Sequence, residues 1–227
     1  MKHIVVLTGA GMSAESGLNT FRDSNGLWEG HDVMAVASPQ GFRSNPELVL
    51  EFYNQRRRQL LDVEPNEGHI ALAGLEKNYQ VSIITQNVDD LHERAGSSNI
   101  LHLHGELLKV RSTFDANESR ICKEDLTLGD LCKKGYQMRP DIVWFGEDVP
   151  LITKAISICE QADILVIIGT SLQVYPAASL MHYAPPDVPV YYIDPNPAVT
   201  NKMNLRVIKA SATEGVKQLI NRLNQQH

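Results

Sequence analysis

Glycines, amides, a carboxylate and imidazoles are concentrated in three short segments of this 227-residue chain. The first is Gly9-Ala10-Gly11, whose small residues let the backbone approach a diphosphate closely. The second is Gln86-Asn87-Val88-Asp89, whose side chains can hydrogen-bond ribose hydroxyls and a carboxamide. The third is His102-Leu103-His104-Gly105, where an imidazole can act as a base near neutral pH. Together these residue types predict a site that binds and processes a nucleotide.

The elements that position these segments can be read from the apolar runs before them. Residues 4–8, 81–85 and 164–168 are mostly apolar and β-branched, which is typical of buried parallel strands. The glycine turn follows the first run, residues 86–89 follow the second, and Gly169-Thr170-Ser171 follow the third. Because ligands bind at the carboxyl ends of parallel strands, we expect all three segments at one edge of a sheet.

Further strands are expected at residues 100–103 and 190–193. Apolar periodicity and capping residues predict helices at 12–16, 46–61, 66–77, 89–95, 152–161 and 213–224. Ser13 is the expected N-cap of the first helix, and residues 112–140 are polar and predicted to be irregular. Strands that alternate with helices predict an α/β fold, a Rossmann-like, doubly wound parallel sheet.

Two insertions in this pattern predict a second, smaller lobe within a single domain of 227 residues. The insertions are residues 30–76 and 111–149. The large part then consists of residues 1–29, 77–110 and 150–227.

Composition narrows the classes of partner and the compartment. The formal net charge is −6 and no basic patch is interleaved with aromatic residues, which argues against direct nucleic-acid binding. No run of about twenty apolar residues predicts a membrane span, and no cleavage-site pattern predicts a signal peptide. A sparse, odd set of three cysteines fits a reducing cytoplasm: Cys122, Cys132 and Cys159. The composition leaves the oligomeric state open.

Each motif taken alone has a second interpretation. The glycine turn is about as consistent with a tight strand-to-helix turn that binds nothing as it is with a turn that binds a diphosphate. Asn87 and Asp89 could cap a helix, and His102 lies two residues from His104, on the same face if both are in a strand. A nicotinamide oxidoreductase would carry an acidic residue at the end of a second strand about twenty residues after the turn. Here residues 21–28 have the composition of a loop, which argues against that class.

Four longer motifs resemble the sirtuins, a family of NAD-consuming protein-lysine deacylases. They are GAGMSAESGLNTFR at 9–22, HLHGEL at 102–107, VWFGE at 143–147 and GTSLQVYP at 169–176. The resemblance runs from Ile4 to about Ala212, and it departs from the common pattern at Leu18-Asn19, where members often carry Ile-Pro.

The resemblance implies roles for individual residues around NAD, a co-substrate that the reaction consumes. It places the catalytic base at His104, gives His102 at most a supporting role, and gives Asn87 a part in catalysis as a residue that bonds a ribose hydroxyl or holds a water. The implied cofactor contacts are Gly9, Ala10, Gly11, Phe21, Arg22, Gln86, Asn87, Asp89, Gly169, Thr170, Ser171, Asn196 (adenosine ribose) and Ala212 (adenine).

The resemblance also implies where an acylated-lysine protein would bind. The family pairs the segment of Val143, Phe145, Gly146 and Glu147 with the substrate backbone, although a Trp/Phe core plug is the alternative. Tyr53 and Arg56 are spaced i and i+3 on one helix, as in sirtuins that remove succinyl and malonyl groups. A phenol and a guanidinium can hold a carboxylate together, although a solvated helix face is again the alternative.

The implied reaction removes succinyl, malonyl or acetyl groups from lysine and forms nicotinamide and O-acyl-ADP-ribose. Protein ADP-ribosyl transfer in the same cleft and a non-catalytic NAD-binding module are the rival interpretations. Most sirtuins bind zinc through two CxxC pairs, whereas this chain has Ser112 and Asp115 at the first pair and only Cys132 at the second. We therefore expect no zinc, because four thiolates are not available.

Overall fold

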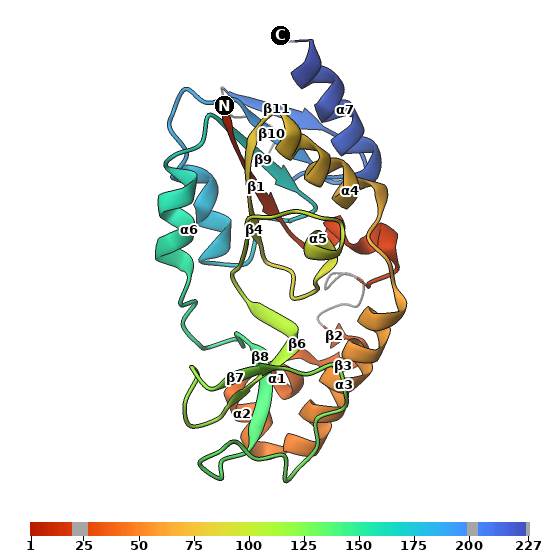
Figure 1. Ribbon diagram of the computed structural model, residues 1–227, viewed down its shortest axis with the longest axis vertical. Helices are drawn as coiled ribbons and strands as arrows, with labels where there is room; N and C mark the ends of the chain where they lie inside the picture. Colours follow the sequence, from red (N-terminus) through yellow and green to blue (C-terminus); the bar gives the residue numbers. More distant parts are fainter. Residues whose placement is uncertain (20–26, 199–203, 226–227) are drawn as a thin grey trace.

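The computed structural model describes residues 1–19, 27–198 and 204–225. The chain forms a large part built on a parallel sheet and a smaller lobe below it in Figure 1. This arrangement agrees with the predicted α/β class and with a second lobe made from insertions.

The large part is a six-stranded, all-parallel sheet in the order β11-β10-β9-β1-β4-β5. Its strands are β1 (His3–Thr8), β4 (Gln80–Thr85), β5 (Ile100–His102), β9 (Ile164–Ile168), β10 (Val190–Ile193) and β11 (Leu205–Ile208). Strand β1 is central, with Ile4 opposite Val81 on one side and Ile164 on the other. The five predicted strands are confirmed, while the edge strand β11 was not predicted.

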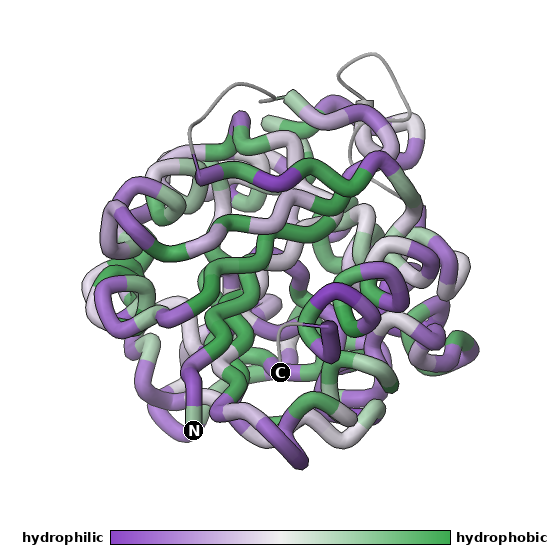
Figure 2. Tube along the Cα trace, turned by 90° about the horizontal axis from the view of Figure 1, so that it is seen from above, coloured by the Kyte–Doolittle hydropathy of each residue, from purple (hydrophilic) through white to green (hydrophobic). Residues whose placement is uncertain are grey.

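Helices cover both faces of this sheet because successive side chains of a strand point to opposite sides. Ile4 and Val6 pack toward α4 (Glu67–Gly74) and α7 (Ala212–Asn224), which lie on one face. Val5 and Leu7 pack toward α6 (Ile152–Cys159) and the 3-10 helix η4 (Ala177–His182) on the other face. Figure 2 shows the hydrophobic strands running through the middle of the molecule between these layers.

Helix α4 belongs with the large part, although it falls within the insertion 30–76 that we expected in the small lobe. Its side chain Leu72 is fully buried against the sheet, and the helix packs along α7. The residues that enter the small lobe from this insertion therefore end near Asp62, where α3 ends. The hydrophobic period of α4 predicts a helix but cannot say which sheet it covers.

The small lobe combines helices with two antiparallel sheets (Figure 1). Its helices are α1 (Val33–Val36), α2 (Pro39–Ser44) and α3 (Pro46–Asp62). Its strands are β2 (Leu27–Trp28) paired with β3 (His31–Asp32), and β6 (Gly105–Ser112) between β7 (Ser119–Ile121) and β8 (Met138–Ile142). Residues 112–140 were predicted to be irregular, and this is wrong for β7 and part of β8, which form only because β6 pairs with them.

Two local features lead into the site. Gly105, where the chain leaves the large sheet, has a left-handed φ of 84°, and a Cβ there would collide with the Asp141 carbonyl oxygen. The predicted helix at 12–16 is instead two 3-10 turns, η1 (Ala10–Met12) and η2 (Ala14–Ser16), and Ser13 caps neither with its side chain.

Short helical turns also occur at α5 (Leu91–Arg94) and η3 (Leu75–Lys77). Within the described residues, the helices are too short or too polar to cross a membrane.

Candidate functional site

A cavity of about 680 Å³ lies where the carboxyl ends of β1, β4, β9 and β10 meet the small lobe. Its size is within the range of roughly 300–1,000 Å³ that is usual for small-molecule and cofactor sites. Eighteen of the predicted residues line it: Gly9, Ala10, Gly11, Tyr53, Arg56, Gln86, Asn87, Asp89, His104, Val143, Phe145, Gly146, Glu147, Gly169, Thr170, Ser171, Asn196 and Ala212. Phe21 and Arg22 lie outside the described residues.

The glycine turn packs directly on the turn that follows β9. The Gly11 amide donates to the Gly169 carbonyl over 2.8 Å, and a Cβ on Gly11 would lie 2.7 Å from the Gly169 Cα. A side chain at Gly9 would meet the Thr170 Cβ at 2.7 Å. These contacts require glycine whether or not a ligand is bound, so the glycines by themselves decide nothing about a ligand. The same turn nevertheless lines the cavity.

Ser13 joins two of the predicted polar residues into one network. Its hydroxyl donates to Asp89 Oδ2 over 2.9 Å and accepts from Asn87 Nδ2 over 3.1 Å. Asn87 Nδ2 also donates to the Gly9 carbonyl, which ties the second segment to the glycine turn. Burial raises the pKa of Asp89, although hydrogen bonds from Ser13 and the Leu91 amide oppose the rise. The bond from the Leu91 amide means that Asp89 also acts as a helix cap through Oδ1.

Gln86 connects the segments that follow β4 and β9, the strands on either side of β1. Its Nε2 donates to Thr170 Oγ1 over 3.1 Å, so the segments after β4 and β9 hold each other. Thr170 Oγ1 also accepts from the Leu172 amide. The contact places an amide group and a hydroxyl group side by side at the cavity wall.

His104 is held with one ring nitrogen free. Its Nδ1 lies 3.1 Å from the Gln86 carbonyl oxygen, and this nitrogen must carry the proton because a carbonyl can only accept. The Nε2 atom is then the unprotonated, basic nitrogen. Burial lowers the pKa of His104, while the bond to Gln86 opposes this effect. The imidazole is therefore neutral and able to accept a proton at neutral pH.

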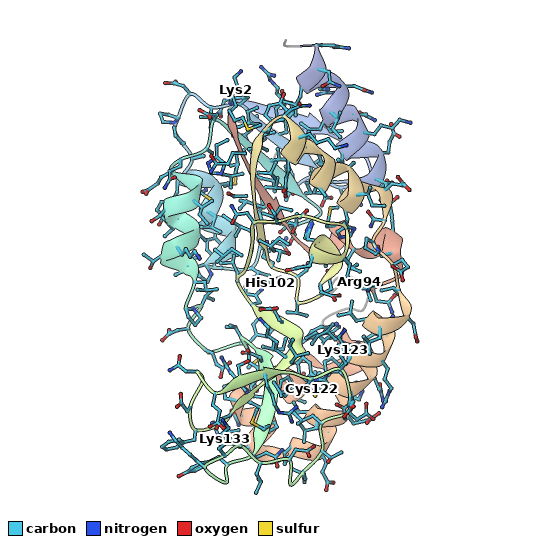
Figure 3. The ribbon with its side chains drawn as sticks, viewed as in Figure 1. Lys2, Arg94, His102, Cys122, Lys123 and Lys133 are labelled. Carbon is cyan, nitrogen blue, oxygen red and sulfur yellow. The ribbon has the colours of Figure 1, made fainter. Side chains whose placement is uncertain are left out.

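His102 has a different environment, because the two histidines do not both lie in a strand and so share no strand face. Strand β5 ends at His102, and His104 lies in the following turn. His102 donates to the Asn87 carbonyl through Nδ1 and faces Glu93 Oε1 at 2.7 Å through Nε2. Burial alone would lower its pKa, but Glu93 raises it. His102 is absent from the cavity lining, and Figure 3 places it between the two parts of the molecule.

The far end of the cavity is formed by residues after β10 and at the start of α7. Asn196 lies in the turn stabilised by its own amide, which donates to Asp194 Oδ1 over 2.7 Å. Ala212 is the first residue of α7 and is buried. Glu15 accepts from the amide and the hydroxyl of Thr213, so the first 3-10 turns are bound to α7.

Tyr53 and Arg56 line the opposite end of the same cavity. Tyr53 is buried, and its hydroxyl accepts a hydrogen bond from Trp144 Nε1 over 2.9 Å. Burial raises the pKa of Tyr53, so the phenol keeps its proton, and the accepted bond leaves that proton available to donate. The Arg56 guanidinium forms an ion pair with Glu29 at 3.1 Å. A solvated helix face is therefore wrong for both residues.

The segment 143–147 continues from β8 but is not itself a strand. Residues 145–147 form a turn, the Val143 amide donates to the His104 carbonyl, and the Phe145 amide donates to the Ala37 carbonyl. Phe145 is 40% exposed at the cavity wall. Trp144 is buried in the small-lobe core, as the core-plug interpretation predicts.

Glu147 is bound within the small lobe. Its carboxylate accepts from both terminal nitrogens of Arg139, over 2.6 and 3.0 Å, and from the Trp144 amide over 2.8 Å. The Arg139 guanidinium also lies 3.4 Å from the centre of the Trp144 ring. Glu147 lines the cavity, and these bonds make it a support for Trp144 and, through Trp144, for Tyr53.

The lobe position that the resemblance assigns to zinc holds a different set of contacts. The Ser112 hydroxyl donates to Cys132 Sγ over 3.3 Å, and Lys134 lies 3.6 Å from the Asp115 carboxylate. Within the ranges that the structure covers, no three His, Cys, Asp or Glu side chains are grouped to hold a metal. The residues present do not fit a four-thiolate site, and Figure 3 shows Cys122 within the small lobe.

Three residues of the site were missed by the sequence analysis. Ser13 was given only a capping role, although a hydroxyl just after the glycine turn could have been recognised as a partner for the amides. Trp144 was considered only as part of a core plug and not as a partner of Tyr53, and Glu29 carried no pattern of its own. Their partners Tyr53 and Arg56 are 91 and 27 residues away in sequence, so no local signal could have revealed the contacts.

The fold and the site together define an α/β protein with a nucleotide-type ligand site at the point where strand order reverses beside β1. Comparison with known proteins makes the assignment specific. Residues 9–176 match the model of the Sir2 family, and the chain belongs to this family of sirtuins.

Curated relatives and solved structures match almost the whole chain. A protein of Helicobacter pylori named NAD-dependent protein deacylase is 62% identical over 98% of both chains. A protein of Bacteroides thetaiotaomicron with the same name is 56% identical over 96% of this chain and 97% of its own. The crystal structure of a Sir2 homologue in complex with NAD is 39% identical in sequence and has a TM-score of 0.89. The match covers 99% of this chain and 90% of that chain.

Proposed function

We propose that this protein is an enzyme, an NAD-dependent protein-lysine deacylase. The observation that carries the proposal is His104, whose Nδ1 is bound to Gln86 so that Nε2 remains a basic nitrogen at the wall of a dinucleotide-sized cavity. Membership of the Sir2 family and the names of the two bacterial relatives support the same activity.

The residues present fit NAD. The turn at Gly9-Ala10-Gly11 offers backbone without side-chain bulk, and Gln86, Asn87 and Asp89 offer the amide and carboxylate groups that hydroxyls and a carboxamide require. Asn196 and Ala212 would hold the adenosine end. NAD, when bound, supplies a ribose carbon whose bond to nicotinamide can be broken.

The two catalytic residues act at the ribose of NAD. His104 Nε2 accepts a proton from a ribose hydroxyl, and Asn87 orients a hydroxyl or a water. The Ser13 and Gly9 contacts keep the Asn87 side chain in one orientation. The overall reaction consumes an acylated lysine, NAD and water, and it releases lysine, nicotinamide and O-acyl-ADP-ribose.

Protein substrates would bind along residues 143–147, with the acylated lysine entering between the two parts of the molecule. Tyr53, a proton donor, and Arg56, a cation, would then face the end of the acyl chain on that lysine. This pair supports removal of succinyl and malonyl groups as well as acetyl groups. The three free cysteines support a cytoplasmic location.

The activity is tested by incubating the purified protein with NAD and an acylated peptide, and by following nicotinamide release and peptide mass together. We expect the peptide to lose its acyl mass, and His104→Ala to lower kcat on the order of 10²–10⁴-fold while NAD binding persists. Near-normal turnover in that variant would remove His104 as the base. A gain of ADP-ribose mass on the acceptor would favour the transferase instead, and absence of nicotinamide release would favour a binding module.

The acyl class is tested with Arg56→Met, which keeps the bulk of the side chain and removes its charge. Succinyl-peptide kcat/KM should fall roughly 10–100-fold, because a hydrogen bond to a charged group is lost. Acetyl-peptide turnover should change little, since acetyl has no distal carboxylate. Equal losses on both peptides would show that Arg56 supports the structure of the lobe and does not select acidic acyl groups.

A further inference from the structure

The cation proposed to bind an acidic acyl group already has a carboxylate partner. Arg56 Nη2 lies 3.1 Å from Glu29 Oε1, and its side chain is only 10% exposed against 32% for Glu29. The guanidinium also packs over Phe52, 4.0 Å from the ring centre, and lies 5.0 Å from the centre of the Trp28 ring. Arg56 and Glu29 both line the cavity.

This pairing changes what an acyl chain meets. A buried cation without a partner is costly, and Glu29 offsets its charge when the pocket holds no acidic group. A neutral acyl chain therefore enters a pocket that is close to electrically balanced. An acidic acyl chain brings a second carboxylate, which competes with Glu29 for the guanidinium.

Glu29 is placed to act in this way. It lies between β2 and β3, in a turn where its own φ is 51° and that of Gly30 is 80°. Its Oε1 also accepts from Asn19 Nδ2 over 3.0 Å, so the carboxylate has a polar neighbour other than Arg56. The contacts between this turn and Arg56 involve side chains, and a carboxylate that is a third exposed can move toward solvent when another anion arrives.

We propose that Glu29 determines the acyl specificity of the site by neutralising Arg56, so that neutral acyl groups are accepted beside acidic ones. This inference rests on the proposed deacylase function and on Arg56 as the acyl-end cation. Loss of the Glu29 charge leaves Arg56 free for the substrate carboxylate and penalises substrates that lack one.

The experiment measures kcat/KM on matched succinyl and acetyl peptides for the wild type, Glu29→Gln, Arg56→Met and the double variant. Glu29→Gln should raise the succinyl-to-acetyl ratio about tenfold, the lower end for a charged hydrogen bond because Glu29 is partly exposed to solvent. The rise should come mainly from a lower KM for the succinyl peptide. The double variant should have the ratio of Arg56→Met alone, because Glu29 acts through Arg56.

A matched control lies on helix α3, the helix that carries Arg56. Glu51 pairs with Arg58 at 2.7 Å on the exposed face of α3, away from the cavity, so Glu51→Gln should leave the ratio unchanged. Glu29→Ser, a smaller neutral replacement, should raise the ratio as Glu29→Gln does, and it replaces that variant if Gln prevents folding.

The outcomes separate the two proposals. If Arg56→Met lowers the ratio but both Glu29 variants leave it unchanged or lower it, the role of Glu29 is overturned and the acidic-acyl site stands. If Arg56→Met leaves the ratio unchanged, Arg56 is not the acyl-end cation. Equal losses on both peptides in the Glu29 variants would make Glu29 a structural residue and would also overturn the inference.

Discussion

A buried pair of histidines beneath the site should make the fold sensitive to mild acid. His69 and His92 are buried, and their rings lie 4.8 Å apart at an angle of 65°. His69 Nδ1 accepts from the Asn66 amide, and His92 Nε2 contacts Thr8 Oγ1 over 3.2 Å. The remaining nitrogen of each ring has no hydrogen-bond partner among the described residues. Neutral His69 carries its proton on Nε2, so a second proton would go to Nδ1, where it would face the Asn66 amide and break that hydrogen bond. A charged His92 ring would leave its Nδ1 proton buried without a partner.

The size of the effect follows from the pKa values. Burial lowers the pKa of His69 to about 4, and burial together with the neighbouring His69 lowers the pKa of His92 well below its usual value. An unfolded histidine has a pKa of about 6.5, so between about pH 6.5 and 4 the unfolded chain binds more protons and the free energy of unfolding falls as pH falls. For His69 alone the loss is about 2 kcal/mol at about pH 5, a large share of a typical stability of about 5–15 kcal/mol.

Urea unfolding at about pH 7.5 and about pH 5 measures this loss. His69→Gln should lower the stability at the higher pH, yet it should reduce the difference between the two pH values by about 2 kcal/mol, because the titrating group is gone. His182→Gln replaces an exposed histidine and should leave the difference unchanged. If His69→Gln kept the full pH difference, the stability loss would come from other groups and the reasoning from buried imidazoles would be refuted.

Two further predictions concern the small lobe. Trp144→Phe and Tyr53→Phe each leave one buried partner unsatisfied, so each should lower the free energy of unfolding by about 1–3 kcal/mol. The double variant should lose less than the sum of the two single losses, by a similar amount. Additive losses in this double-mutant cycle would mean that the hydrogen bond contributes nothing. Metal analysis of the purified protein should find no stoichiometric zinc, because Ser112 and Asp115 stand where thiolates are needed. One zinc per chain, whose removal by a chelator unfolds the protein, would contradict this prediction.

Much of the large part could be predicted because its signals are local. The runs at 4–8, 81–85 and 164–168 are buried on both sides of the sheet, and such runs are distinctive in sequence. The turn or polar segment after each run then lies at the carboxyl edge for a geometric reason that requires no knowledge of distant contacts. The sequence therefore predicted that the glycine turn, residues 86–89 and residues 169–171 meet at one edge, and the cavity that they line confirms it.

The small lobe was predicted less well because its strands depend on distant partners. Strands β7 and β8 have little apolar periodicity of their own and pair only with β6, which begins at Gly105. Helix α4 was expected in this lobe, and its contacts with the large sheet through Leu72 and with α7 decide otherwise. Edge strand β11 was missed because its half-exposed residues lack a buried pattern.

The sequence by itself determined the residue types of the site, their order along the chain and the edge of the sheet at which they meet. Only the tertiary structure decided their chemical states. It placed a carbonyl against His104 Nδ1, a carboxylate against His102 Nε2, an indole N–H against the Tyr53 hydroxyl and the Glu29 carboxylate against Arg56. These states depend on burial and on partners 9 to 91 residues away, so the hydrogen bonds and charges that set each pKa exist only once the chain has folded.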